Sequence, residues 1–88
     1  MEIYFEENFE KDLKKYKNIK LLNKIEEIIN DIKNLQNLRN IKNLKKLKGY
    51  DTFYRIKLGD YRIGLDIIEN KVIFTRFLHR KDIYKYFP

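Results

Sequence analysis

The second half of the chain alternates between apolar and polar residues, a pattern that predicts β-strands. Two alternating segments, residues 53–58 and 61–68, flank the dipeptide Gly59-Asp60. A glycine at the first position of a two-residue loop suits the tight turns that connect antiparallel strands. A third apolar run follows at residues 72–79. These segments together predict a three-stranded antiparallel meander.

The hairpin also predicts which residues of its two strands lie opposite each other. If Gly59 and Asp60 form the turn, Lys57 pairs with Arg62. Arg55 then lies two residues further along the same face. Like charges that face each other across two strands destabilise a sheet. We therefore expect this face to bind something anionic.

The alternate positions of the same strands are apolar and predict the buried face. They are Tyr54, Ile56, Leu58, Tyr61, Ile63, Leu65 and Ile67. Gly64 stands opposite Arg55 on the other face, and its missing side chain is expected to leave room for a ligand near the backbone. Strict alternation in the third strand would place Arg76 on the apolar side. Either a β-bulge or a position at the sheet edge would resolve that conflict.

The first half predicts a short strand followed by two helices. Residues 3–5 are apolar, and helical spacing of apolar residues begins near Asn8. Asn18 is suited to cap the second helix. The Asn-rich residues 34–45 repeat every three positions, which cannot hold one apolar face of a helix, and we interpret them as a connector. The predicted fold is α+β, in the order β-α-α-β-β-β, with the two-helix hairpin packed on a small antiparallel sheet and a short C-terminal tail.

Length and composition narrow the class of protein. The chain has 88 residues, which predicts a single domain over residues 1–88. It has no Cys and one His, so we expect no disulfide, metal site or cofactor. The N-terminus is acidic and lacks a signal-peptide pattern, and no apolar run is long enough to span a membrane. We therefore expect a cytoplasmic protein without a membrane partner.

The net charge of +7 is unevenly distributed. Residues 1–34 contain seven Lys and eight acidic residues, whereas residues 35–88 contain thirteen Lys or Arg and five acidic residues. The basic character therefore belongs to the predicted sheet, which favours nucleic acid or an acidic protein as partner. Arginines at positions 55, 62, 76 and 80 suit phosphate recognition. The alternative is a surface of solvated lysines.

Three motifs resemble the RelE/ParE superfamily of type II toxins. They are Leu47-Lys48-Gly49, the segment 54–63 with its Gly-Asp-Tyr-Arg turn, and the segment 79–84, His-Arg-Lys-Asp-Ile-Tyr. The predicted order of elements matches over nearly the whole chain. The resemblance implies either a ribosome-dependent endoribonuclease that cuts mRNA in the A site, as in RelE-type members, or an inhibitor of DNA gyrase, as in ParE-type members. It also implies a cognate antitoxin, which we expect to be RelB-like, acidic and bound over the basic face or in place of the tail.

The residues fit RNA cleavage independently. RNA is cut without a metal when a 2′-OH attacks the adjacent phosphate, which requires a base, cations for the developing charge and an acid for the leaving oxygen. Lys57 is the candidate base, because Arg55 and Arg62 disfavour its charged form. The two arginines are candidates for stabilising the transition state. Arg80 could clamp the phosphate or donate the proton, and Tyr84 could stack on an unpaired base.

Five basic residues are expected to bind RNA, among them Arg55, which is also a candidate for stabilising the transition state. They are Arg55, Arg76, His79, Lys81 and Lys48. His79 could act as an acid or base, but it comes five residues before Tyr84, unlike a C-terminal His-Tyr pair. Either Arg76 or Arg80 could be the catalytic arginine of the tail. Two structural alternatives stay open: Tyr84 could only dock the C-terminus, and Lys57 with Arg62 could bind phosphate without catalysis.

Overall fold

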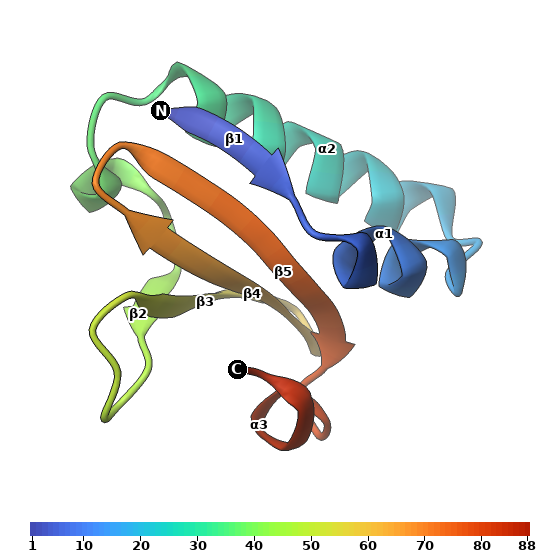
Figure 1. Ribbon diagram of the computed structural model, residues 1–88. Coiled ribbons are helices and arrows are strands. Elements are labelled where there is room, and N and C mark those ends of the chain that lie inside the picture. The colour runs from blue at the N-terminus through green and yellow to red at the C-terminus, as the bar shows by residue number, and fades with distance from the viewer.

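The computed structural model describes residues 1–88 and is built on a five-stranded sheet (Figure 1). The strands are β1 (Glu2–Phe5), β2 (Leu44–Lys46), β3 (Phe53–Leu58), β4 (Tyr61–Ile68) and β5 (Lys71–His79). Their order across the sheet is β1-β5-β4-β3-β2. β1 runs parallel to β5, and the other neighbours are antiparallel. The predicted meander is confirmed as β3-β4-β5, with the N-terminal strand at one edge.

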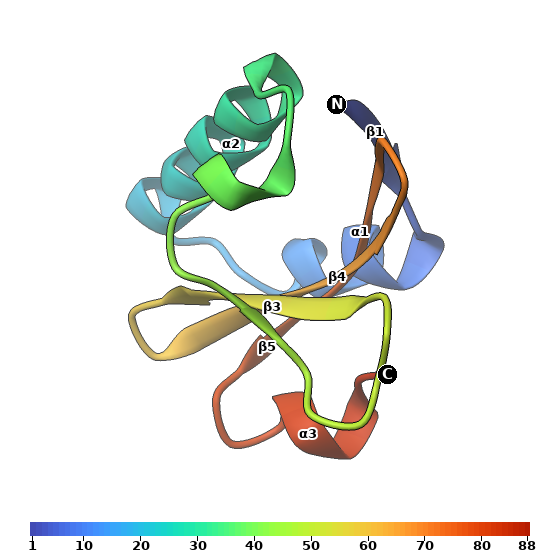
Figure 2. The same ribbon diagram turned by 90° about the vertical axis from the view of Figure 1, so that its left-hand side faces the viewer.

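Helices cover the two faces of the sheet unequally. They are α1 (Glu7–Lys14), α2 (Ile19–Asn34), the 3₁₀ turn η1 (Leu38–Asn40) and α3 (Ile83–Tyr86). The Asn18 side chain caps α2 as predicted, accepting a hydrogen bond of 3.2 Å from the N–H of Leu21. Figure 2 shows α2 and α3 on opposite sides of the sheet. We call the side under α2 the helix face and the side under α3 the tail face. No helix is long and apolar enough to cross a membrane.

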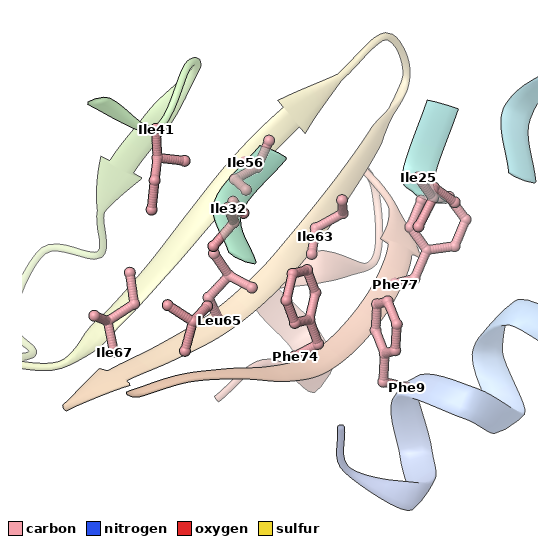
Figure 3. Packing of buried hydrophobic residues seen from close by; sticks show 11 residues of the cluster. Phe9, Ile25, Ile32, Ile41, Ile56, Ile63, Leu65, Ile67, Phe74 and Phe77 are labelled. Carbon is pink, nitrogen blue, oxygen red and sulfur yellow. The ribbon is translucent and has the colours of Figure 1, made fainter. Parts of the chain in front are cut away.

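The main hydrophobic core lies on the helix face. Eleven buried residues form it: Phe9, Ile25, Ile32, Ile41, Ile56, Ile63, Leu65, Ile67, Val72, Phe74 and Phe77. Figure 3 shows how side chains from the strands meet those from the helices and the connector. The apolar alternation of β3 and β4 predicts this face correctly, because successive strand residues point to opposite sides. The α+β fold class is thereby confirmed.

A β-bulge decides the position of Arg76. Gly64 pairs with Arg76 and Leu65 with Phe74, so Thr75 is the additional residue on β5. The hydroxyl of Thr75 donates a hydrogen bond of 2.9 Å to the carbonyl oxygen of Gly64. The extra residue returns Arg76 to the tail face while Phe74 and Phe77 both remain in the core. Of the two alternatives from the sequence, the bulge is therefore present.

Two short elements were not predicted. Residues 44–46 form β2, which pairs with β3 at the sheet edge and overlaps the end of the segment interpreted as a connector. The tail forms α3, and Leu47, Ile83 and Phe87 make a second buried cluster on the tail face, with Phe53 and Leu78 packed against it. We call these five residues the tail cluster.

The expectation for Gly64 was wrong. No open space for a ligand lies above this residue, because the ring of Phe87 packs directly on it. Local alternation along β4 could not show this contact, since it joins residues 23 positions apart. The C-terminal tail itself fills the space that the missing side chain leaves.

Candidate functional site

Cations face each other across three strands of the tail face. Lys57 on β3 pairs with Arg62 on β4, as the sequence predicts, and Arg55 pairs with Gly64. β2 adds a further like-charge pair, because Lys45 lies opposite Arg55. Each such pair opposes strand association in the absence of an anion. The arrangement therefore favours a ligand that carries several negative charges.

The hairpin turn orients the guanidinium of Arg62. Gly59 has a φ of +57°, a conformation that glycine tolerates readily. Nη1 of Arg62 donates hydrogen bonds of 2.8 Å to the carbonyl oxygens of Gly59 and Tyr61. These two bonds leave Nε and Nη2 free to donate to a phosphate. The turn thus presents a partly fixed fork of donors at the end of the hairpin.

Arg55 and Lys57 are both tied to Asn43, just before β2. Nη1 of Arg55 donates to the carbonyl oxygen of Asn43 at 3.3 Å. The backbone N–H of Lys57 donates to the same oxygen at 3.2 Å. Nε of Arg55 is buried without a hydrogen-bond partner. A buried donor without a partner is costly, and an anion that reached it would remove that cost.

The start of the tail lies at the same end of the sheet as the hairpin turn. The backbone N–H of Arg80 donates to the carbonyl oxygen of Asp60 at 2.8 Å. Its side chain lies 3.9 Å from the Asp60 carboxylate, with both side chains mostly exposed. Nδ1 of His79 accepts a hydrogen bond of 3.1 Å from the N–H of Lys81. Lys57, Arg62 and Arg80 are therefore gathered at one end of the sheet.

Tyr84 and the two remaining lysines lie further along the chain. Tyr84 belongs to α3 and is 68% exposed, so its ring is available to a ligand. Lys81 is exposed between β5 and α3. Lys48 is also exposed, in the loop from β2 to β3, at the opposite end of β3 from Lys57. Among the predicted RNA-binding residues, Lys48 is therefore separated from the hairpin turn by the length of β3.

Arg76 forms an ion pair that sequence reasoning missed. Its Nε and Nη2 donate to the two carboxylate oxygens of Asp12, at 2.8 and 3.1 Å. The Asp12 carboxylate also accepts from the N–H of Phe77 at 2.9 Å, on a part of β5 beyond the reach of β1. The hydrogen bond with Asp12 raises the pKa of Arg76 above its ordinary value. One signal was present: Asp12 lies three residues after Phe9, on the buried side of α1.

A large groove of the molecule lies elsewhere. It has a volume of about 630 Å³ and runs between α2, residues 40–43 and β3, on the helix face. Of the candidate site residues only Lys57 borders it. A single nucleic acid strand binds along an open cationic strip with exposed aromatic rings, so we place the candidate site on the tail face. No group of three or more His, Asp or Glu side chains gathers anywhere in the chain.

Comparisons with known proteins identify the family. A family model described as "ParE toxin of type II toxin-antitoxin system, parDE" matches residues 3–84. The chain belongs to this toxin family. A relative named Toxin RelE3, from Methanocaldococcus jannaschii, is 56% identical over 41 residues. That alignment spans 47% of this chain and 47% of the relative, about half the length of each.

Solved structures of toxins share the fold. The RelB-RelE antitoxin-toxin complex from Methanococcus jannaschii contains a chain that is 43% identical, with a TM-score of 0.81 over 97% of this chain and 99% of that chain. The RelBE2 complex from Mycobacterium tuberculosis matches at 20% identity and a TM-score of 0.70, covering 90% and 96% of the two chains. YafQ from E. coli matches at 16% identity and a TM-score of 0.65, covering 94% and 97%. The last two show the fold alone, whereas the family match and the 43% identical chain confirm the RelE/ParE resemblance.

Proposed function

We propose that this member of the toxin family is a ribosome-dependent endoribonuclease that cuts mRNA in the A site and stops translation. The register that places Lys57 opposite Arg62, next to the N-terminal end of the tail, carries the proposal. Chemistry at this place needs only the RNA and the side chains. The 2′-OH attacks the adjacent phosphorus, the bond to the 5′-oxygen breaks, and the products end in a cyclic phosphate and a 5′-OH.

Each group has a defined role in this reaction. Lys57 takes the proton of the 2′-OH. Arg62 and Arg55 donate hydrogen bonds to the phosphate oxygens, whose charge rises in the transition state. Arg80 clamps the phosphate and supplies a proton to the leaving 5′-oxygen. Tyr84 stacks on a base of the bound strand, which its exposure on α3 permits.

Basic residues around this centre are proposed to hold the rest of the RNA. Lys48 and Lys81 are exposed, and His79 is partly buried at the end of β5. We assign the catalytic arginine of the tail to Arg80, because the guanidinium of Arg76 is occupied by Asp12. Arg76 is then proposed to act on RNA only through its charge.

A cognate antitoxin is the proposed partner in the resting cell. The relatives in the solved complexes from Methanococcus jannaschii and Mycobacterium tuberculosis are bound to RelB-type antitoxins. We propose an acidic, RelB-like antitoxin for this chain, because the second half of the sequence holds thirteen basic and five acidic residues. A complex that left Arg55, Lys57 and Arg62 exposed and the tail in place would contradict this.

Primer extension on mRNA tests the proposal. Purified wild-type toxin and Arg62→Ala are each incubated with mRNA, with and without ribosomes. We expect cuts within codons that require ribosomes and are lost in Arg62→Ala. Circular dichroism of the variant serves as the control for folding, since Arg62 bonds only to its own turn.

The alternative is a ParE-like toxin that binds DNA gyrase, which the name of the matching family favours. In that case the folded wild type leaves mRNA intact, and DNA supercoiling by gyrase falls when the toxin is added. Growth arrest that persists in the Lys57→Ala, Arg62→Ala double variant would support the gyrase target. Loss of arrest together with loss of mRNA cuts would support the nuclease.

A further inference from the structure

Gly64 on β4 must be a glycine because a neighbouring side chain packs against it, and not because its backbone has a conformation that only glycine tolerates. Gly49 and Gly59 have positive φ angles of +88° and +57°, whereas Gly64 has none. A Cβ atom on Gly64 would lie 2.8 Å from Cγ and Cδ1 of Phe87 and 2.9 Å from its Cδ2. These separations are well inside the normal contact distance of about 3.5–4.0 Å between carbon atoms. Only a glycine at position 64 therefore allows Phe87 to pack this closely on β4.

The same ring holds the end of α3. Phe87 is 4% exposed and packs edge-on against Phe53, with ring centroids 5.5 Å apart. Its backbone N–H donates to the carbonyl oxygen of Ile83 at 2.8 Å, and Ile83 is itself fully buried in the tail cluster. α3 has four residues, far too few to be stable in isolation. Its position therefore depends on the side chains that it buries.

A polar contact reaches the same helix from the other side. Nη1 of Arg76 lies 3.5 Å from the carbonyl oxygen of Tyr86, while the rest of its guanidinium is bound by Asp12. The guanidinium carbon also lies 6.0 Å from the centre of the Tyr86 ring. Tyr84, by contrast, is 68% exposed and takes no part in the tail cluster. The side chain with a proposed role is thus carried by a helix that its neighbours hold in place.

We propose that Gly64 and Phe87 are positioning residues for Tyr84: the contact between them fixes α3 so that Tyr84 meets the RNA on the tail face. The inference rests on the proposed function and adds two residues outside the cationic centre. Phe87 touches no RNA in this arrangement, and Gly64 has no side chain with which to do so. Both act through the position of Tyr84.

The variant Gly64→Ala separates the tail from the sheet. β4 is paired with β3 on one side and β5 on the other, so the strand cannot move away from the new methyl group. α3 is the last helix and contacts mainly β5. The clash is therefore relieved by displacement of Phe87 and α3, with the main core unchanged. Ile68→Ala is the control, because it changes a 43% exposed side chain of the same strand, four residues along the chain from Gly64.

A double-mutant cycle on cleavage tests the coupling. Single-turnover rates on ribosome-bound mRNA are measured for wild type, Gly64→Ala, Tyr84→Ala and the double variant. We expect Gly64→Ala to slow cleavage by roughly 5- to 150-fold, the loss of one stacked base, and Tyr84→Ala to do the same. The double variant should be no slower than the slower single variant. If the two losses multiply, or if Gly64→Ala is faster than wild type because α3 obstructs the RNA, the proposal is wrong.

Hydrogen exchange gives a readout without catalysis. The amides of Lys85, Tyr86 and Phe87 close α3 through bonds to Asp82 and Ile83. In Gly64→Ala and Phe87→Ala we expect these amides to exchange fast, while the amides of β3 and β4 stay protected. In Phe87→Leu we expect part of the protection of α3 to remain. Unchanged protection in both alanine variants would overturn the inference. If wild type cuts no mRNA, the proposed function fails, and exchange still decides whether Gly64 and Phe87 hold α3. Should Gly64→Ala not fold, Phe87→Ala replaces it in the cycle.

Discussion

The helix face and the tail face of this sheet are built from the same strands but carry different kinds of side chains. On the helix face, eleven buried apolar residues form one continuous core. On the tail face the buried apolar cluster has only three residues, and two like-charge pairs, Lys45 with Arg55 and Lys57 with Arg62, stand across neighbouring strands. The first face holds most of the buried apolar side chains, whose burial stabilises the fold. The second can therefore keep cations that repel one another, which is what binding to a polyanion requires.

The largest effect on stability should come from the helix face. Phe74 is 0% exposed, and its ring lies 5.3 Å from that of Phe9. Phe74→Ala should lower the free energy of unfolding by about 3–5 kcal/mol, because it removes a large buried ring and leaves a cavity. Tyr84→Ala, on the tail face, should change it by less than about 0.5 kcal/mol. Urea denaturation of both variants measures the contrast, and similar losses would show that the faces are not divided in this way.

The reverse contrast should hold for Lys57. If it is the base, Lys57→Ala should slow cleavage by about 10²- to 10⁴-fold. Stability should stay the same or rise by about 0.2–1 kcal/mol, because one like-charge pair is removed. Lys57→Arg is the matched control: it keeps the positive charge but cannot act as a base near neutral pH. Cleavage by Lys57→Arg at close to the wild-type rate would leave Lys57 as a phosphate-binding residue only.

The sequence predicts the hairpin register well and the tail poorly, for one physical reason. Alternation with a period of two and the Gly59-Asp60 turn are local, and together they determine that Lys57 pairs with Arg62. The contact of Phe87 with Gly64 joins distant residues and leaves no periodic signal. β2 was missed similarly, because three residues are too few to show a period.

The site was predicted in part. The sequence identifies the cations at the hairpin, and the structure gathers Lys57, Arg62 and Arg80 at one end of the sheet. It does not reveal that Asp12 binds Arg76, because that pair depends on where β1 ends beside β5. The roles assigned to the individual residues stay predictions.

Arg76 contacts Asp12 of α1 and the carbonyl oxygen of Tyr86 in α3, and we expect it to contribute to the free energy of unfolding. Arg76→Ala leaves the Asp12 carboxylate, on a residue that is 2% exposed, without its cation. We expect a loss of about 1.5–3 kcal/mol in the free energy of unfolding. Arg80→Ala is the control, since the exposed pair with Asp60 at 3.9 Å should contribute less than about 1 kcal/mol. Weaker RNA binding without loss of stability in Arg76→Ala would instead favour a direct contact with RNA.

The smallest effect concerns ionisation on the helix face. Burial, with smaller contributions from Tyr61, Asp12 and Asp82, raises the pKa of Tyr16 above its ordinary value of 10.0. The folded state therefore holds the Tyr16 proton more tightly than the unfolded state does. The stability that this proton contributes is complete below pH 10 and declines as the pH rises through the raised pKa. Tyr16→Phe cannot ionise, so its stability should fall less steeply above pH 10 than that of wild type. Denaturation curves from pH 8 to 11 measure the difference. Identical slopes of stability against pH for the two proteins would mean that Tyr16 ionises as freely in the folded protein as in the unfolded chain. The packing of its ring against Tyr61 and Phe77 would then not exclude water from the hydroxyl.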